Sequence, residues 1–134
     1  MTYYFAKTLA VGFDEALRRT VDALKLEGFG IITEIDVKET FRKKLDIEFR
    51  NYRILGACNP KLAYEALQIE DKVGTMLPCN VVVQEIDDGQ TEVATIDPVA
   101  SMLAIDNPRL KQAAEQVRVK LRQAIERLWL PQGC

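Results

Sequence analysis

The segment from Asn80 to Ile96 constrains the fold of this chain more than any other. Two runs rich in β-branched residues, Asn80–Ile86 and Thr91–Ile96, flank the tetrapeptide Asp87-Asp88-Gly89-Gln90. An Asp-Gly pair between such runs favours the positive φ angles of a tight hairpin turn. The segment therefore predicts two adjacent antiparallel strands, and the rest of the chain must complete a sheet around them.

Three other segments have the composition or the alternation of strands. Thr2–Ala10 is rich in aromatic and β-branched side chains, and Gly30–Ile35 is a second short run of this kind. Phe49–Ala57 alternates, with Tyr52 and Ile54 on one face and Arg53 and Leu55 on the other. Together with the hairpin, these segments predict about five strands.

The helices are marked by the residues at their ends. Asp14–Glu27 has apolar residues at three- and four-residue steps and is followed by Gly28, which favours a C-terminal cap. Side chains that can accept an N-cap hydrogen bond precede four further segments. These are Val37–Leu45 after Asp36, Pro60 to about Ile69 after Asn59, a short turn Val99–Ala104 after Asp97-Pro98, and Pro108 to about Leu130 after Asn107. Glu70–Pro78 holds Gly and Pro without periodicity and predicts a loop.

The last helix keeps an apolar stripe along its length, so it must cover a broad surface. Antiparallel neighbours with helices between and after them predict an α+β fold, in which helices cover one face of an antiparallel sheet of about five strands. The chain has 134 residues, 48% of them hydrophobic, which suits a single domain spanning residues 1–134.

Charge and hydropathy exclude several classes of partner. The net charge is −2 and the isoelectric point is near 5.3, whereas binding to nucleic acid needs a concentrated basic surface. No apolar run is long enough to cross a bilayer, and the first residues lack the basic start and apolar centre of a signal peptide. We therefore expect a cytoplasmic protein that binds neither nucleic acid nor membrane.

The catalytic inventory is small. There is no histidine, which excludes Ser-His and Cys-His nucleophile pairs, imidazole zinc ligands and histidine acid–base chemistry. The three cysteines lack the paired spacing of a zinc ribbon or a disulfide framework, so reduced thiols are expected. No P-loop or GxGxxG motif occurs. We expect no cofactor and no metal site, and we favour a protein that is not an enzyme.

One short stretch, Cys58-Asn59-Pro60, places a thiol just before a predicted helix start. The helix dipole and exposed N–H groups there can lower a thiol pKa. Cys79 immediately precedes the predicted hairpin, and Met76 lies three residues before Cys79. A thiolate pair with a thioether would suit redox chemistry, sulfur transfer or a soft metal such as Cu(I). The alternative is structural, because free cysteine is among the most buried residue types and Asn59 and Pro60 are explained by capping alone.

Several of these segments together resemble a known family. The runs YRILGACNPKLAYEAL (Tyr52–Leu67) and LPCNVVVQE (Leu77–Glu85), and the pair Asp97-Pro98 after the hairpin, are similar to the bacterial and archaeal domain of unknown function 302. The likeness extends from about Phe13 to Arg127. It implies a β-α-β(4)-α fold like that of the TATA-binding protein, with a long C-terminal helix on an antiparallel sheet, and a dimer. It implies no activity, substrate or cofactor.

Two functional hypotheses follow. The first is a binding or interaction module, a homodimer, with a small-ligand pocket between the sheet and the C-terminal helix. Its candidate binding residues are Cys58, Asn59, Met76, Leu77, Pro78 and Cys79. The second is a thiol redox or sulfur-transfer protein that uses Cys58 and Cys79, with a soft-metal site as a third reading. We expect Trp129 to contribute to a subunit contact and Cys134 to be a bystander.

Overall fold

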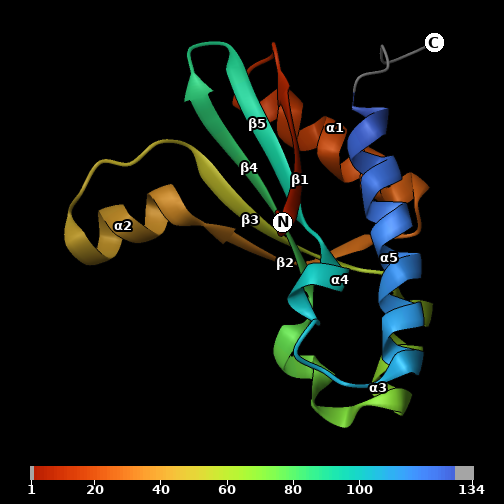
Figure 1. Cartoon of the computed structure of the whole chain (residues 1–134). Helices are drawn as coiled ribbons and strands as arrows, with labels where there is room; N and C mark the ends of the chain where they lie inside the picture. Colours follow the sequence, from red (N-terminus) through yellow and green to blue (C-terminus); the bar gives the residue numbers. More distant parts are fainter. Residues whose placement is uncertain (1, 129–134) are drawn as a thin grey trace.

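The computed structural model describes residues 2–128, so the predictions for Trp129 and Cys134 lie outside the described residues. The described residues form five strands and a set of helices in the expected order, and Figure 1 shows their arrangement. The strands are β1 (Tyr4–Leu9), β2 (Gly30–Asp36), β3 (Tyr52–Cys58), β4 (Cys79–Asp87) and β5 (Gln90–Ile96). The helices are α1 (Phe13–Leu26), α2 (Val37–Leu45), α3 (Pro60–Ile69), the 3-10 helix η1 (Asp71–Met76), α4 (Pro98–Ser101) and α5 (Pro108–Arg127).

The strands form one sheet in the order β1-β5-β4-β3-β2, and every neighbouring pair is antiparallel. β1 and β2 therefore run parallel at opposite edges, and α1 joins them across one face. The long helix α5 packs beside α1 on that face and also reaches β1 and β5 (Figure 1). The α+β fold with a long C-terminal helix is confirmed, with α2, α3 and α4 inserted in the connections.

The local signals for helix ends are also confirmed. After α1, Gly28 takes a φ of +87°, and the backbone N–H of Phe29 donates to the carbonyl of Leu24 at 2.9 Å. This is the left-handed turn that glycine permits at the end of a helix. Each of the four later α-helices begins with an Asp or Asn whose Oδ1 accepts from a backbone N–H in the first turn. These residues are Asp36, Asn59, Asp97 and Asn107.

Two predictions of local structure are wrong. The predicted loop Glu70–Pro78 contains η1, a 3-10 helix whose Val73 is completely buried, so tertiary burial gives the segment an order that its periodicity does not show. β3 begins at Tyr52 rather than Phe49. The Phe49 ring instead packs against Phe41 of α2, with ring centroids 5.1 Å apart.

Most of the buried apolar side chains of residues 2–128 form two clusters. The larger lies between the sheet and the pair α1 and α5, and includes Val81, Val83, Val93 and Leu121. The smaller lies among α3, η1, α4 and α5, and includes Ala66, Val73, Met102, Leu110 and Ala114. Within residues 2–128, no helix is both long and apolar enough to cross a membrane.

Candidate functional site

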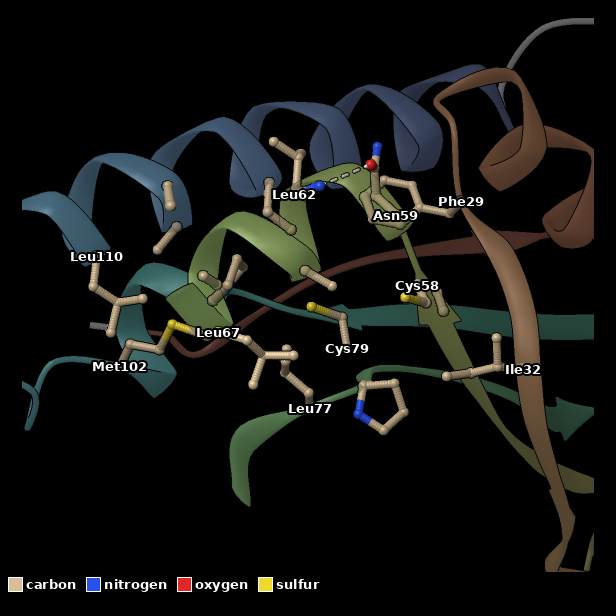
Figure 2. Close-up of a pocket in the computed structure, with 18 residues that line it drawn as sticks. Phe29, Ile32, Cys58, Asn59, Leu62, Leu67, Leu77, Cys79, Met102 and Leu110 are labelled. Carbon is tan, nitrogen blue, oxygen red and sulfur yellow. Dashed lines mark hydrogen bonds between the residues drawn. The ribbon is translucent and has the colours of Figure 1, made fainter. Parts of the chain in front are cut away.

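A cavity of about 280 Å³ lies where the end of the sheet meets α3 and α5 (Figure 2). Ala57 and Cys58 of β3 and Cys79 of β4 form one side of it. Leu62 and Ala66 of α3 and Leu110 and Ala114 of α5 line the others, together with Leu77 and Pro78 before β4. Ile32 and Leu67 are partly exposed and also line the cavity, so it opens to solvent.

The walls are almost wholly apolar. None of the 18 lining residues in Figure 2 is charged, and the polar side chains among them are Cys58, Asn59 and Cys79. The Asn59 side chain serves the fold, because its Oδ1 accepts from the N–H of Leu62 at 3.3 Å. Ligand sites in proteins are mostly apolar concavities with few polar groups. This cavity has that character, without a group that would hold a charge.

Gly56 of β3 allows Pro78 to pack closely against the strand beside the cavity. A Cβ on Gly56 would lie 2.0 Å from Oγ1 of Thr33 and 2.7 Å from Cγ of Pro78, both of which are closer than real Cβ atoms approach. The missing side chain therefore lets the Pro78 ring pack against β3, and Leu77 and Cys79 on either side of it line the cavity. The Leu77–Pro78 peptide bond is cis.

Cys58 and Cys79 are both free thiols on neighbouring strands. Cys79 pairs across the strands with Ala57, the residue before Cys58. Burial raises the pKa of the Cys79 thiol to about 11, and the neighbouring Cys58 adds to this increase. Because the thiolate is the reactive form, Cys79 stays protonated and unreactive at neutral pH.

Comparison with known proteins places the chain in a family. The model of the family described as domain of unknown function DUF302 matches residues 5–128. The chain belongs to the DUF302 family. It is similar in structure to an uncharacterised conserved DUF302 protein from Bacillus stearothermophilus, whose crystal structure superposes with a TM-score of 0.87. The two are 28% identical over 96% of this chain and 99% of the other. A comparison with curated proteins finds no match.

In this DUF302 protein, five of the six predicted site residues line one cavity. They are Cys58, Asn59, Leu77, Pro78 and Cys79. Met76 belongs to the smaller hydrophobic cluster. Among the described residues, no three His, Cys, Asp or Glu side chains lie where they could hold a metal ion together.

Most of the lining residues that the sequence interpretation did not assign to the site lie on α3 and α5, four on each helix. Ala113, Ala114 and Leu110 lie on the apolar side of α5, and Ala63 and Ala66 line the facing helix α3. A signal for them exists in the sequence, because α3 has two alanines, and α5 three, among the residues of its apolar side. Small side chains at a helix contact leave space unless the backbones approach closely.

Proposed function

We propose that this DUF302 protein is a non-enzymatic binding module whose cavity takes a small, uncharged, apolar molecule. The observation that supports this proposal is the cavity itself, about 280 Å³ in volume and lined without a single charged residue. Protein interiors are close-packed and ordinarily contain few voids larger than a water molecule. A space of this size with a solvent opening is therefore better suited to a ligand than to the core.

The volume limits the size of the ligand. An apolar cavity of roughly 150 Å³ in another protein stays dry and accepts benzene. The cavity of about 280 Å³ is nearly twice as large. It therefore fits a compound of about two fused rings, or an aliphatic chain of similar bulk, and is too small for most cofactors.

The chemistry of the walls favours binding over catalysis. No acid, base or cation lines the cavity, so its walls offer packing and desolvation. The thiol alternative needs an available thiolate, and burial works against one at Cys79. An anionic ligand would lose its hydration without gaining a partner, which is strongly unfavourable.

The test compares naphthalene with 1-naphthalenesulfonate by protein-observed NMR titration. We expect naphthalene to shift the amide signals of residues along α3 and α5, and the sulfonate to bind about tenfold more weakly or worse because its charge would be buried without a partner. Equal binding of both compounds, or shifts confined to other parts of the protein, would contradict the proposal.

Two variants on α5 provide a matched control. Ala114→Leu places a larger side chain at the cavity wall and should abolish naphthalene binding. Ala124→Leu makes the same substitution on the same helix at a buried position in the larger core, away from the cavity, and should leave binding intact. If naphthalene binds both variants equally, the cavity is not its site.

A further inference from the structure

The apolar lining of the cavity continues outwards to the protein surface. Leu110 is buried, whereas Leu77 and Pro78 in the same lining are half-buried. Leu67 is 41% exposed and Ile32 is 62% exposed, and both still line the cavity. Exposed apolar side chains that are continuous with an apolar cavity are typical of a binding groove, unlike single apolar residues scattered over a surface. We call Ile32 and Leu67 the apolar rim.

Ile32 reaches the cavity because it occupies a β-bulge in the edge strand β2. Its two neighbours pair with consecutive residues of β3, Ile31 with Ala57 and Thr33 with Gly56, so Ile32 has no partner across the strands. Figure 2 shows its side chain pointing from β2 towards the other lining residues. A bulge of this kind re-aims a side chain, and bulges are frequent beside functional sites. The extra residue in β2 thus becomes part of the cavity lining.

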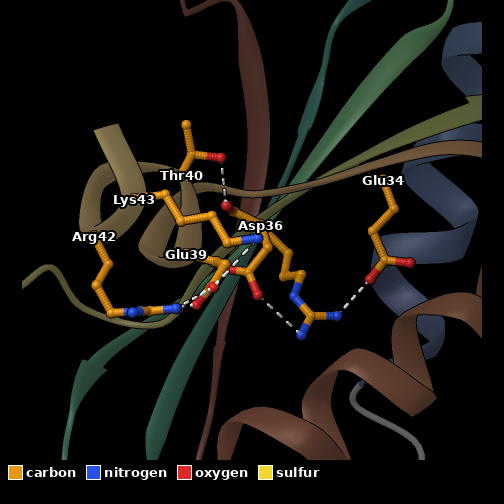
Figure 3. Close-up of polar contacts among 7 residues, drawn as sticks. Glu34, Asp36, Glu39, Thr40, Arg42 and Lys43 are labelled. Carbon is orange, nitrogen blue, oxygen red and sulfur yellow. Dashed lines mark hydrogen bonds and ion pairs between the residues drawn. The ribbon is translucent and has the colours of Figure 1, made fainter. Parts of the chain in front are cut away.

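The bulge is held in place by contacts between β2 and β3. Arg53 forms ion pairs with Glu34 at 2.5 Å and with Asp36 at 3.4 Å. Figure 3 shows the polar contacts around these two acids. At the bulge, a Cβ on Gly56 would lie 2.0 Å from Oγ1 of Thr33, so β2 and β3 approach closely there because residue 56 is glycine. Ile32 is therefore positioned before a ligand arrives, which lowers the entropy lost on binding.

The volume of the cavity limits how much of a chain it can enclose. An apolar cavity of roughly 150 Å³ in another protein accepts benzene, which is roughly 25 Å³ for each carbon. At the same ratio, the cavity of about 280 Å³ encloses about 11 carbons. A compact compound of two rings ends inside this space and leaves the apolar rim uncovered. A longer linear chain must pass through the opening, where the rim gives it an apolar surface.

We propose that the cavity binds a free linear alkyl chain longer than about 11 carbons, and that Ile32 and Leu67 bind the part of the chain that the cavity cannot enclose. This inference rests on the proposed function, because it assigns a ligand class to the same cavity. An uncharged polar end of the chain stays in solvent, since the apolar walls give it no partner. Ile32 and Leu67 are then the residues that determine specificity for chain length.

The test compares alkyl maltosides with hexyl, decyl and tetradecyl tails by isothermal titration calorimetry, at concentrations below micelle formation. The maltose hydroxyls would lose their hydration in the apolar cavity, so only the tail enters. Full burial of one CH₂ group increases affinity about fourfold. Half of that free energy for each carbon beyond the opening predicts that the wild-type protein binds the tetradecyl compound about tenfold more tightly than the decyl compound.

Serine substitutions in the apolar rim should remove this preference. Ile32→Ser and Leu67→Ser should each reduce the advantage of the tetradecyl over the decyl compound to about threefold or less, and should leave decyl affinity within about twofold of wild type. Ile35→Ser is the matched control on β2, because Ile35 is 49% exposed and does not line the cavity. Leu103→Ser, at 56% exposure, serves in the same way for Leu67. Both controls should keep the wild-type preference.

A measurement on the wild-type protein needs no substitution. In methyl-observed NMR, tetradecyl maltoside should shift the signals of Ile32 and Leu67 more than those of Ile35, and hexyl maltoside should leave all three nearly unchanged. If neither naphthalene nor hexyl maltoside binds, the proposed function is overturned together with this inference. If they bind but the tetradecyl and decyl compounds bind equally, or if Ile32→Ser behaves like Ile35→Ser, the cavity keeps its proposed function and the role of the apolar rim is overturned.

Discussion

Replacement of Ala114 by leucine tests whether the cavity is truly unfilled. Leucine adds three carbon atoms, and burial of each contributes about 0.8 kcal/mol. The gain of about 2.4 kcal/mol is reduced by the rotamer entropy of leucine, about 0.5–1 kcal/mol. If the new side chain enters the space of about 280 Å³, the free energy of unfolding should therefore increase by about 1.5–2 kcal/mol.

Ala124→Leu should have the opposite sign. Ala124 lies on the same helix and is equally buried, with 2% of its surface exposed against 3% for Ala114, but it packs in the larger core. Additional carbons in a close-packed core force neighbours to move and destabilise by about 1–3 kcal/mol. The pair thus differs in available space and in little else.

Urea unfolding followed by far-UV circular dichroism gives the measurement. With a slope of about 1–3 kcal/mol per molar urea for a small domain, Ala114→Leu should move the midpoint up by about 1 M, and Ala124→Leu should move it down by a similar amount. If both variants are destabilised equally, the space beside Ala114 is already filled and the reasoning is refuted.

Three further perturbations follow from single contacts. Gly56→Ala should destabilise the protein by about 1–3 kcal/mol, because the added Cβ would meet Oγ1 of Thr33. Gly30→Ala should not, because the space around Gly30 is open. If Thr33→Ala restores part of the loss in a thermal melt, the clash with Thr33 is its cause. Folding raises the pKa of the Cys79 thiol from 9.0 to about 11. The stabilisation that results is complete below pH 9, and the free energy of unfolding should fall by about 2–3 kcal/mol as the pH rises towards 11. Urea titrations at several pH values should show that Cys79→Ala lacks this loss. Asp97→Asn should retain the cap on Val99, so it should be about 1 kcal/mol more stable than Asp97→Ala, and equal unfolding free energies would contradict a capping role.

The parts of the fold that could be predicted from sequence are those with local causes. An Asp or Asn before a helix acts through hydrogen bonds within three residues, so Asn59 and Asn107 mark their helix starts whatever surrounds them. The Asp-Gly turn of the hairpin is equally local. By contrast, η1 is ordered by the burial of Val73 among distant helices, which leaves no periodic signal in the segment itself.

The candidate site lies between these cases. The motif around Cys58 and the segment before Cys79 are brought to one cavity by the pairing of β3 with β4, and the sequence indicated both. A pocket between the sheet and the C-terminal helix was a hypothesis from the sequence, but its size and its wall on α3 could not be derived, because they depend on alanines from α3 and α5, helices far apart in the chain. Empty space results from side chains that fail to meet, and single-sequence patterns report only the side chains that are present.

The position of β1 in the sheet affects how the protein folds during its synthesis. Its Tyr4 pairs with Ile96, 92 positions later, so the first strand to be synthesised is the last to find its neighbour. At about 5–20 residues per second, translation leaves it without a partner for roughly 5–20 seconds. During that interval β1 is a free β-segment next to others on the same polysome. Lys7 lies in the middle of β1, and a charged side chain in an edge strand discourages pairing with the wrong strand.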